Sequence, residues 1–534
     1  MPSRIYSSRG RLMDDSEKLE TIEMKGDSRA IYGGFTCGLI LGILGILSAF
    51  LSQYSQIFPL LALVAAPLAV GVFMLPGDLP SRLVYASVLA LTVELLLGGT
   101  GAWLTIAGVP IRYLLLFGGL LTGAIYVLIE RDFSFPRVES VLVILCGAAF
   151  PALWFGFSVF VENNDPGAVF GNVGFLGTLL VYFPLFLLAR REGTLFSGTL
   201  LGLFLVLSIT LLFAPLAPQS YIEWFAGNVS AFPNGYQRVS LNAQVLLAAA
   251  MVWGILYFAD ATKSSLYRTV GGIMALISSI ALSLSFMRGV LLAVVLILVG
   301  SLVAGALISG TKPLRLRILG ASIVLVPIVF SAMFFLSPEG AARFYNLPGE
   351  VASFANVSQG DSNSRQSDSG NTQGGTEPKS QTNSEPQTNS ERIRESQSEV
   401  LLNGWREEPL LGSGAGAIPE EYESVGRKNF ELEYHALLYR GGVVAVVFIG
   451  ALLALLAFRY LSLLRWRSAA LFTNRGKAAV SMLAAALITA VAGLVNPLLT
   501  SAYFGFLAAA ALVLFGTLNE DKPGEADKQN FSNS

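Results

Sequence analysis

Long apolar runs dominate this chain, and they constrain its fold more than any other feature. A helix needs about 20 residues to cross the hydrocarbon core of a bilayer. Fourteen runs of about that length lie at about 31–52, 57–75, 83–99, 112–129, 139–161, 168–188, 195–215, 240–259, 267–286, 289–309, 317–336, 437–457, 479–497 and 499–518. Lipid offers the backbone no hydrogen-bond partner, so each run must be helical. We therefore predict an all-α, polytopic transmembrane helical bundle of about 12–14 spans with one large extracytoplasmic loop.

The composition excludes an ordinary soluble domain. The 534 residues are 53% hydrophobic and only 13% charged, with a mean hydropathy of +0.62, whereas about 25% charged is usual for soluble domains. The net charge of -1 gives no basic patch that would favour nucleic acid as a partner. Cys37 and Cys146 fall in separate apolar runs, which indicates small core residues and neither a disulfide nor a metal site.

The distribution of positive charge predicts the orientation in the membrane, because Lys and Arg in short loops collect on the cytoplasmic side. With the N-terminus inside, 23 of the 35 Lys and Arg residues fall on that side, 3 in short outer loops and 9 in or beside the long loop. We therefore expect a cytoplasmic tail at 1–30, eleven spans within 31–336, three more within 437–518 and a second cytoplasmic tail at 519–534.

The long loop, about 337–436, is then extracytoplasmic. Its middle, at about 353–390, is rich in Ser, Asn, Gln and Gly and has almost no apolar residues, which predicts disorder. From Glu391 the sequence favours a helix, followed by a turn at Pro409 and the glycine-rich stretch GSGAG at 412–416. That stretch does not follow a strand in a βαβ unit, so we interpret it as a tight turn that folds the loop back on the membrane.

His435 is the only histidine of the chain and lies where the long loop meets an apolar run. An imidazole titrates near neutral pH, so His435 is the candidate general base or acid; a hydrogen-bonded structural role is the alternative. Glu431 and Glu433 precede it, and a carboxylate beside the imidazole would fix its tautomer. Glu431 is the one expected on the same helix face.

Two outer arginines, Arg238 and Arg288, lie close to the apolar boundary, on the side from which positive charge is otherwise cleared. The fork of donors on a guanidinium suits a phosphate or diphosphate, and the alternative is that each side chain reaches to lipid headgroups. Arg392 and Arg394 lie in the helical part of the loop, where they either join this site or face solvent. No cluster with metal-ligand spacing accompanies them.

These segments resemble the O-antigen ligase and polymerase family, integral membrane glycosyltransferases that act outside the cytoplasmic membrane. The similar stretches are QRVSLNAQVLL, SFMRGVLLAV, RIRES with PLLGSGAG, EYHALLYRGGVVAV and LVNPLLTSAYFGFLAAAALVLFG, which together cover about 235–518. The sequence departs from the family pattern at Met287, where serine commonly precedes the arginine, and at Ala436, where asparagine commonly follows the histidine.

The resemblance implies transfer of a glycan from a polyprenyl-diphosphate carrier to an acceptor hydroxyl on a lipid, a glycan or a protein. Arg238, Arg288, Arg392 and Arg394 would bind the diphosphate and His435 would be catalytic, without cofactor or metal. Ligase and polymerase remain open alternatives. A transporter of lipid-linked glycan or of a small anion is the rival class. Glu94, an acid within the third apolar run, either points to proton or ion coupling in such a transporter or is a buried, hydrogen-bonded acid.

Overall fold

The computed structural model describes residues 30–48, 57–74, 78–97, 105–106, 109–131, 135–213, 228–231, 237–240, 245–260, 265–284, 293–300, 389–423, 432–466, 473–494 and 498–518, with 51, 243, 263, 303, 320, 430 and 471. Several predictions lie outside these residues: the tails at 1–29 and 519–534, the disordered part of the loop up to 388, nearly all of the predicted span at 317–336 and about half of that at 289–309.

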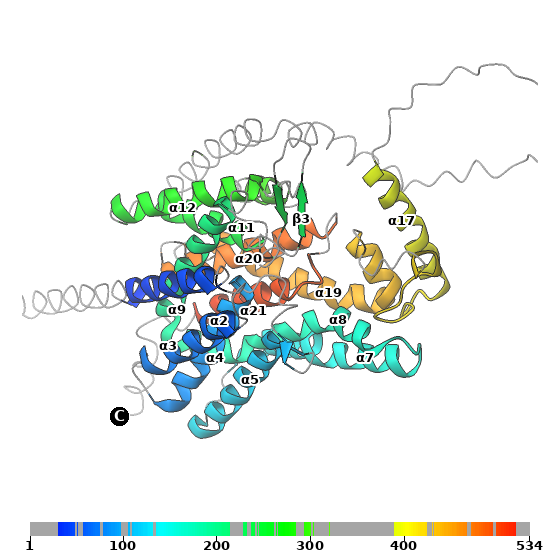
Figure 1. The fold of residues 1–534 in the computed structure, drawn as a ribbon, viewed down its shortest axis with the longest axis horizontal. Helices are drawn as coiled ribbons and strands as arrows, with labels where there is room; N and C mark the ends of the chain where they lie inside the picture. Colours follow the sequence, from blue (N-terminus) through cyan, green and yellow to red (C-terminus); the bar gives the residue numbers. More distant parts are fainter. Residues whose placement is uncertain are drawn as a thin grey trace, which may run out of the picture.

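The described residues form an all-α polytopic bundle, as predicted (Figure 1). Eight helical stretches are long and apolar enough to cross a membrane, so the chain is a multi-pass membrane protein. They are Ala30–Ser48, α4 (Leu79–Leu97), α5 (Ile111–Glu130), α6 with η2 and α7 (Arg137–Ile144, Leu145–Ala149, Phe150–Phe160), α8 with η3 and α9 (Pro166–Gly177, Thr178–Val181, Tyr182–Phe213), α12 (Ser265–Leu284), α19 (Glu433–Trp466) and α20 (Asn474–Ala492).

Shorter apolar helices complete the membrane part: α2 with η1 and α3 (Ile57–Leu60, Leu61–Ala65, Ala66–Met74), α11 (Val245–Ala259) and α21 (Ala502–Thr517). The stretch from α8 to α9 contains the predicted spans 168–188 and 195–215, and Glu192, with φ -122° and ψ 31°, breaks the helix between them. The long loop contributes α17 (Asn389–Glu407) and α18 (Glu420–Glu423), and α17 confirms the helix predicted from Glu391.

Two small antiparallel hairpins were not predicted. β1 (Thr105–Ile106) pairs with β2 (Val109–Pro110), and β3 (Asn228–Ala231) pairs with β4 (Gln237–Ser240). The helix of the predicted span at 240–259 begins later than expected, at Val245, and Ser240 is the last residue of β4. Arg238, predicted just before that span, lies in β4 opposite Ser230.

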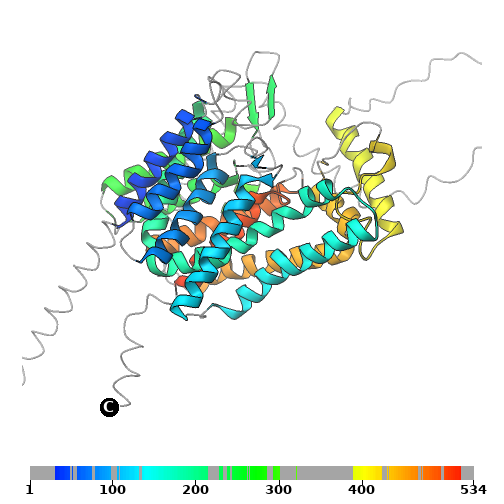
Figure 2. The same ribbon diagram turned by 60° about the horizontal axis from the view of Figure 1, so that its bottom comes forward.

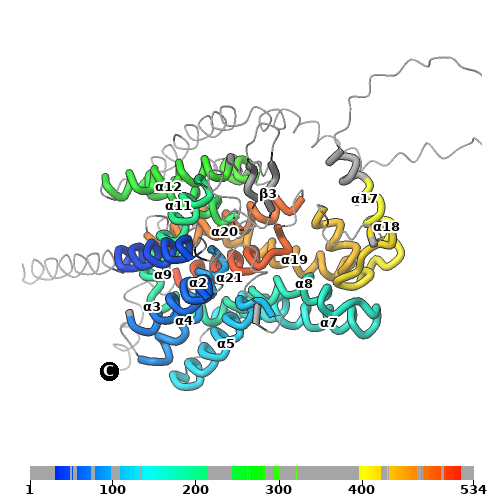
Figure 3. Tube along the Cα trace, viewed as in Figure 1, coloured from blue at the N-terminus to red at the C-terminus, as the bar shows by residue number. Residues whose placement is uncertain are grey.

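The C-terminal helices α20 and α21 lie in the middle of the bundle, between the blue and green helices of the first half of the chain (Figure 3). Their sequences are rich in alanine, and nearly every residue of α21 is buried. Small side chains let neighbouring helices approach closely in a membrane, where packing takes over from the hydrophobic effect. Cys37 and Cys146 are both buried in this core, as predicted.

The helix Ala30–Ser48 packs on the second half of α9 through glycines on both helices. A Cβ added at Gly34 would overlap the carbonyl of Leu195, and one at Gly38 would overlap that of Thr199. Gly202 faces the first helix in the same way. The residue numbers of the contacting pairs increase together along the two helices, from Gly34 with Leu195 to Gly38 with Thr199, so the helices are parallel. The alternating topology requires this, since these are the first and seventh predicted spans.

We expect Gly38→Ala to lower the midpoint of thermal unfolding in detergent. The added methyl has no room beside the Thr199 carbonyl, and overpacking of this kind typically costs about 1–3 kcal/mol. The matched control is Gly118→Ala in α5, because a Cβ there meets nothing within 4 Å. Equal midpoints for the two variants would contradict the close packing of these helices.

α19 is broken at Gly442, and we call the part before the break the first helix of α19. This helix joins α17, α18 and residues 408–419 in a small unit that we call the cap. Figure 2 shows that the cap helix α17 and the β3–β4 hairpin lie at the same end of the bundle. We call this the cap end. The cap has a hydrophobic cluster of its own, separate from the main core, made by Leu401, Ala417, Phe430, Ala436 and Tyr439.

Ion pairs link segments that the alternating topology places on the same side. Four pairs join segments predicted to lie on the cytoplasmic side: Arg191 with Asp78, Arg191 with Glu130, Lys477 with Asp260, and Arg459 with Glu139. A fifth pair, Arg112 with Glu94, joins the ends of two predicted spans that face the outer side. None of these pairs connects an expected inner segment with an expected outer one, which supports the predicted alternation of the spans.

Candidate functional site

A break in α19 separates the cap from the membrane bundle. Gly442 has φ +59° and ψ -161°, a conformation essentially restricted to glycine. The helix hydrogen bonds lost at the break are replaced by residues 408–417, which we call the glycine loop. The N–H of Val443 donates to the Pro409 carbonyl at 3.0 Å, and that of Val444 to the Leu410 carbonyl at 3.2 Å. In the other direction, the N–H of Ser413 donates to the Tyr439 carbonyl at 2.8 Å.

The glycine loop also bonds to the turn between α7 and α8. The Asn164 side chain donates to the carbonyls of Ser413 and Ala415 at 3.1 and 3.2 Å, and the N–H of Ala415 donates to Ser158 Oγ at 2.7 Å. Gly412, Gly414 and Gly416 have φ between +66° and +83°, which favours glycine at each position. The prediction that GSGAG is a tight turn folding back on the membrane part is thus confirmed.

Arg440 connects the cap, the break and α8. Its Nε donates to the Ala417 carbonyl at 3.2 Å, and its guanidinium bonds to the side chain of Asn172. The same guanidinium lies over the ring of Phe430, 5.1 Å from the centroid. From α7, Trp154 Nε1 donates to the Arg440 carbonyl at 3.1 Å. Arg440 therefore holds the first helix of α19 at a fixed angle to the bundle.

His435 is the third residue of α19 and is half-buried. Tyr439, one turn further on, packs on Gly404 of α17, so His435 leaves the helix on the face turned towards α17. Among the residues that the structure describes, none makes a hydrogen bond or ion pair with the imidazole. Neither ring nitrogen is thus engaged in a hydrogen bond with the described part of the chain.

Glu433 bonds to a distant turn and makes no hydrogen bond with His435. Its carboxylate is buried and accepts hydrogen bonds from the N–H groups of Leu499, at 2.6 Å, and Thr500 in the turn between α20 and α21. Backbone donors in a buried turn need an acceptor, and Glu433 supplies it. Tyr434 adds a bond to the Ala490 carbonyl at 2.7 Å. These bonds fix the backbone on which His435 stands. Glu431 lies outside the described residues.

The predicted arginines are placed only in part. Arg238 lies in β4, and Arg392 and Arg394 lie in the first turns of α17, so three of the four belong to elements at the cap end (Figure 2). Arg288 lies outside the described residues. The grouping of these arginines with His435 around one substrate stays a prediction.

Glu94 forms a buried ion pair with Arg112. Glu94 Oε1 accepts from Arg112 Nη2 at 3.0 Å and Nε at 3.3 Å, and the Glu94 side chain is 0% exposed. Tyr503 lies within hydrogen-bonding reach of the same guanidinium. Glu94 Oε2 has no hydrogen-bond partner among the described residues. The reading of Glu94 as a buried, hydrogen-bonded acid is therefore confirmed for one of its two oxygens.

The residues that fix the cap were not singled out in the sequence. Arg440, Asn164 and Asn172 lie in or beside apolar runs and match no catalytic spacing. The Gly441–Gly442 pair, inside an otherwise apolar run, was the one local signal of a break. No group of three or more His, Cys, Asp or Glu lies close enough together to hold a metal ion in the described part of the chain.

Comparison with known proteins adds no family assignment. No family model matches the chain, and no match was found among curated proteins or among solved structures. The fold and the composition define the class of the protein as a multi-pass, all-α membrane protein. Any narrower class rests on the residues themselves.

We expect Gly442→Ala to loosen the cap. A Cβ at Gly442 would overlap the Leu410 carbonyl, and the backbone conformation there is strained for any other residue, which costs about 1–3 kcal/mol. Limited proteolysis within 408–423 should become faster. Gly450→Ala, in the same helix and with nothing within 4 Å of the added Cβ, is the control. Unchanged cleavage of Gly442→Ala would show that the break does not hold the cap.

Proposed function

We propose that the chain is a membrane glycosyltransferase that moves a glycan from a polyprenyl-diphosphate carrier to an acceptor hydroxyl. The observation that carries the proposal is the placement of His435. The only histidine stands on a backbone fixed by Glu433 and Tyr434, half-buried and turned towards the cap, with no hydrogen bond among the described residues. A general base needs such a fixed position and a free ring nitrogen.

The arginines of the cap end would bind the donor. α17 and the first helix of α19 run in the same direction, since Gly404 packs on Tyr439, and Leu401 shares a cluster with Ala436. Arg394, two turns before Leu401, therefore lies towards the His435 end of this helix pair. Arg238 and Arg288 are the other proposed diphosphate ligands, with Arg392 beside Arg394. Two or more guanidiniums would neutralise the diphosphate without a bound metal ion.

In the proposed reaction, a nitrogen of His435 takes the proton of the acceptor hydroxyl as that oxygen attacks the anomeric carbon. The bond between this carbon and the diphosphate oxygen breaks, and the diphosphate leaves with the electron pair. The arginines stabilise the charge that develops on the leaving group. The acceptor would be a lipid, a growing glycan or a protein.

The proposal places the protein in the cytoplasmic membrane with the cap end outside. The distribution of Lys and Arg supports this orientation. The ion pairs support the alternation of the spans on which the orientation rests.

The glycan profile of a strain that lacks the protein tests the proposal. Full-length chains left on the carrier would indicate a ligase, and single repeat units would indicate a polymerase of the same family. The wild-type protein should restore the normal profile in each case. An unchanged profile would count against both activities.

A transporter of lipid-linked glycan or of a small anion is the second candidate, and one observation favours it. Glu94 is a fully buried acid within a helix long enough to span a membrane, and its Oε2 has no partner among the described residues. Ionisable groups at such positions mark ion or proton pathways in transport proteins. Uptake of labelled substrate into proteoliposomes that contain the wild-type protein, lost in a folded Glu94→Gln/Arg112→Gln variant, would support this candidate.

A further inference from the structure

The glycine loop lies at the depth of the membrane spans. It bonds on one side to Val443 and Val444 of α19 and on the other to Ser158 of α7. Those residues belong to helical stretches long and apolar enough to cross a membrane, Glu433–Arg465 and Arg137–Phe160. The loop is therefore level with apolar turns of two spans, namely the end of α7 and the part of α19 that follows the break, although it belongs to a non-helical segment.

Backbone at such a depth must find its hydrogen bonds inside the protein, because lipid supplies none. The glycine loop meets this condition to a large extent. The carbonyls of Pro409, Leu410, Ser413, Gly414, Ala415 and Ala417 each accept a bond from a group of the protein, and the N–H groups of Gly412, Ser413, Ala415 and Ala417 each donate one. Groups of the protein thus bond to most carbonyls of the loop, including those of Pro409 and Leu410.

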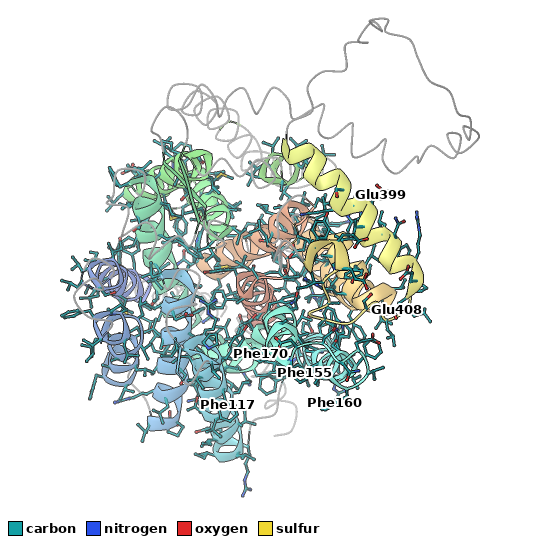
Figure 4. The ribbon with its side chains drawn as sticks, turned by 45° about the vertical axis from the view of Figure 1, so that its right-hand side comes forward. Phe117, Phe155, Phe160, Phe170, Glu399 and Glu408 are labelled. Carbon is teal, nitrogen blue, oxygen red and sulfur yellow. The ribbon has the colours of Figure 1, made fainter. Side chains whose placement is uncertain are left out.

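The two leucines of the loop point away from the protein. Leu410 is 69% exposed and Leu411 is 48% exposed. The two helical stretches to which the loop bonds also expose apolar side chains, namely Leu153 and Phe160 of α7, Val161 just after it, and Val443 and Val447 of α19. Figure 4 shows Phe160 near the end of α7 and Glu408, just before the leucines, at the same edge of the molecule.

Polar groups mark the water side of this surface. Trp405 donates its Nε1–H to the Pro409 carbonyl at 3.1 Å, and tryptophan is enriched at membrane–water interfaces. Partial burial together with the charge of Glu408 raises the pKa of Glu162. The apolar edge is thus bounded by an indole and two acids, as at the boundary between acyl chains and headgroups.

We propose that residues 409–411 enter the lipid leaflet at the cap end and that Leu410 and Leu411 insert their side chains among its acyl chains. The loop is bonded to the break in α19, so this anchor also sets the height of the His435 helix above the lipid. Only that last consequence rests on the proposed function; the anchor itself does not.

Quenching in lipid nanodiscs tests the anchor. Cys37 and Cys146 are replaced by alanine, and Leu410→Cys and Leu411→Cys are labelled singly with a fluorophore. Phe160→Cys, at an 80% exposed site on α7, is the lipid control, and Glu399→Cys, on the exposed face of α17, is the water control. Brominated phosphatidylcholine and iodide serve as quenchers. We expect the loop labels to lose as large a fraction of fluorescence to the brominated lipid as the Phe160 label, and as little to iodide.

Two outcomes would overturn the anchor. Iodide quenching of the loop labels at the level of the Glu399 label would show that the loop is in water. Protection from both quenchers would show that protein, such as a second copy of the chain, covers the leucines. Each label site is an exposed side chain, and the elution volume of every labelled variant is compared with that of the wild type. Glycan transfer does not enter this readout, so its outcome is separate from that of the enzymatic proposal.

Discussion

Replacing His435 with glutamine is expected to lower glycan transfer by a factor of about 10²–10⁴, the usual contribution of a general base. Glutamine keeps a similar size and polarity but cannot take up the proton of the acceptor hydroxyl. The initial rate of transfer from a lipid-linked glycan in proteoliposomes measures the effect. In the wild type, the rate should rise with pH as the imidazole loses its proton, because only the neutral ring is a base; the variant should lack this rise.

Leu438→Ala is the control for this prediction, because Leu438 lies one turn further along α19 and is also half-buried. It should retain a transfer rate near that of the wild type with the same pH profile. If His435→Gln and Leu438→Ala transferred glycan equally well, His435 would not be the base, and the proposed reaction would lose its central residue.

Glu94→Gln is expected to be among the most destabilising single substitutions in the bundle. It leaves the buried guanidinium of Arg112 without its counter-charge, and breaking a buried pair in this way costs about 3–5 kcal/mol. The midpoint of thermal unfolding in detergent should fall clearly. Glu399→Gln, which changes an exposed acid of α17, should leave the midpoint unchanged.

The double variant Glu94→Gln/Arg112→Gln should regain much of the lost stability, because it removes both buried charges together. A single variant as stable as the wild type would mean that the pair contributes nothing. The same variants separate the two candidate functions. Loss of transport in the stable double variant, with glycan profiles unchanged, would favour the transporter. Retained glycan transfer in it would leave Glu94 a structural role only.

The membrane architecture was largely predictable, since two strong physical rules decide it. A bilayer permits only helices for runs such as 479–497, and α20 lies there as expected. The alternation of positive charge predicted that Asp78, Glu130 and Arg191, in three separate predicted loops, lie on the same side of the membrane, and the structure pairs them. The β3–β4 hairpin escaped prediction because its strands are four residues long and alternate too briefly to stand out from the adjoining apolar run.

The candidate site was predictable only where a local pattern was sufficient. The turn at GSGAG follows from the glycines themselves, since positive φ angles suit no other residue as well. The role of Glu433 could not be predicted, because the N–H groups that it accepts from belong to a turn some 66 residues further along the chain. Arg440 and Asn164 act through contacts with distant segments, and no spacing in one sequence records such contacts.

The parallel contact between the helix Ala30–Ser48 and α9 bears on how the protein is made. During synthesis the first helix leaves the ribosome early, yet the glycine face that α9 covers stays without its partner until the helices from α3 to α8 have also been inserted. Chains truncated before the end of α9 should therefore hold their first helix loosely and be prone to degradation. Quality control of the nascent protein would then depend on this one late contact.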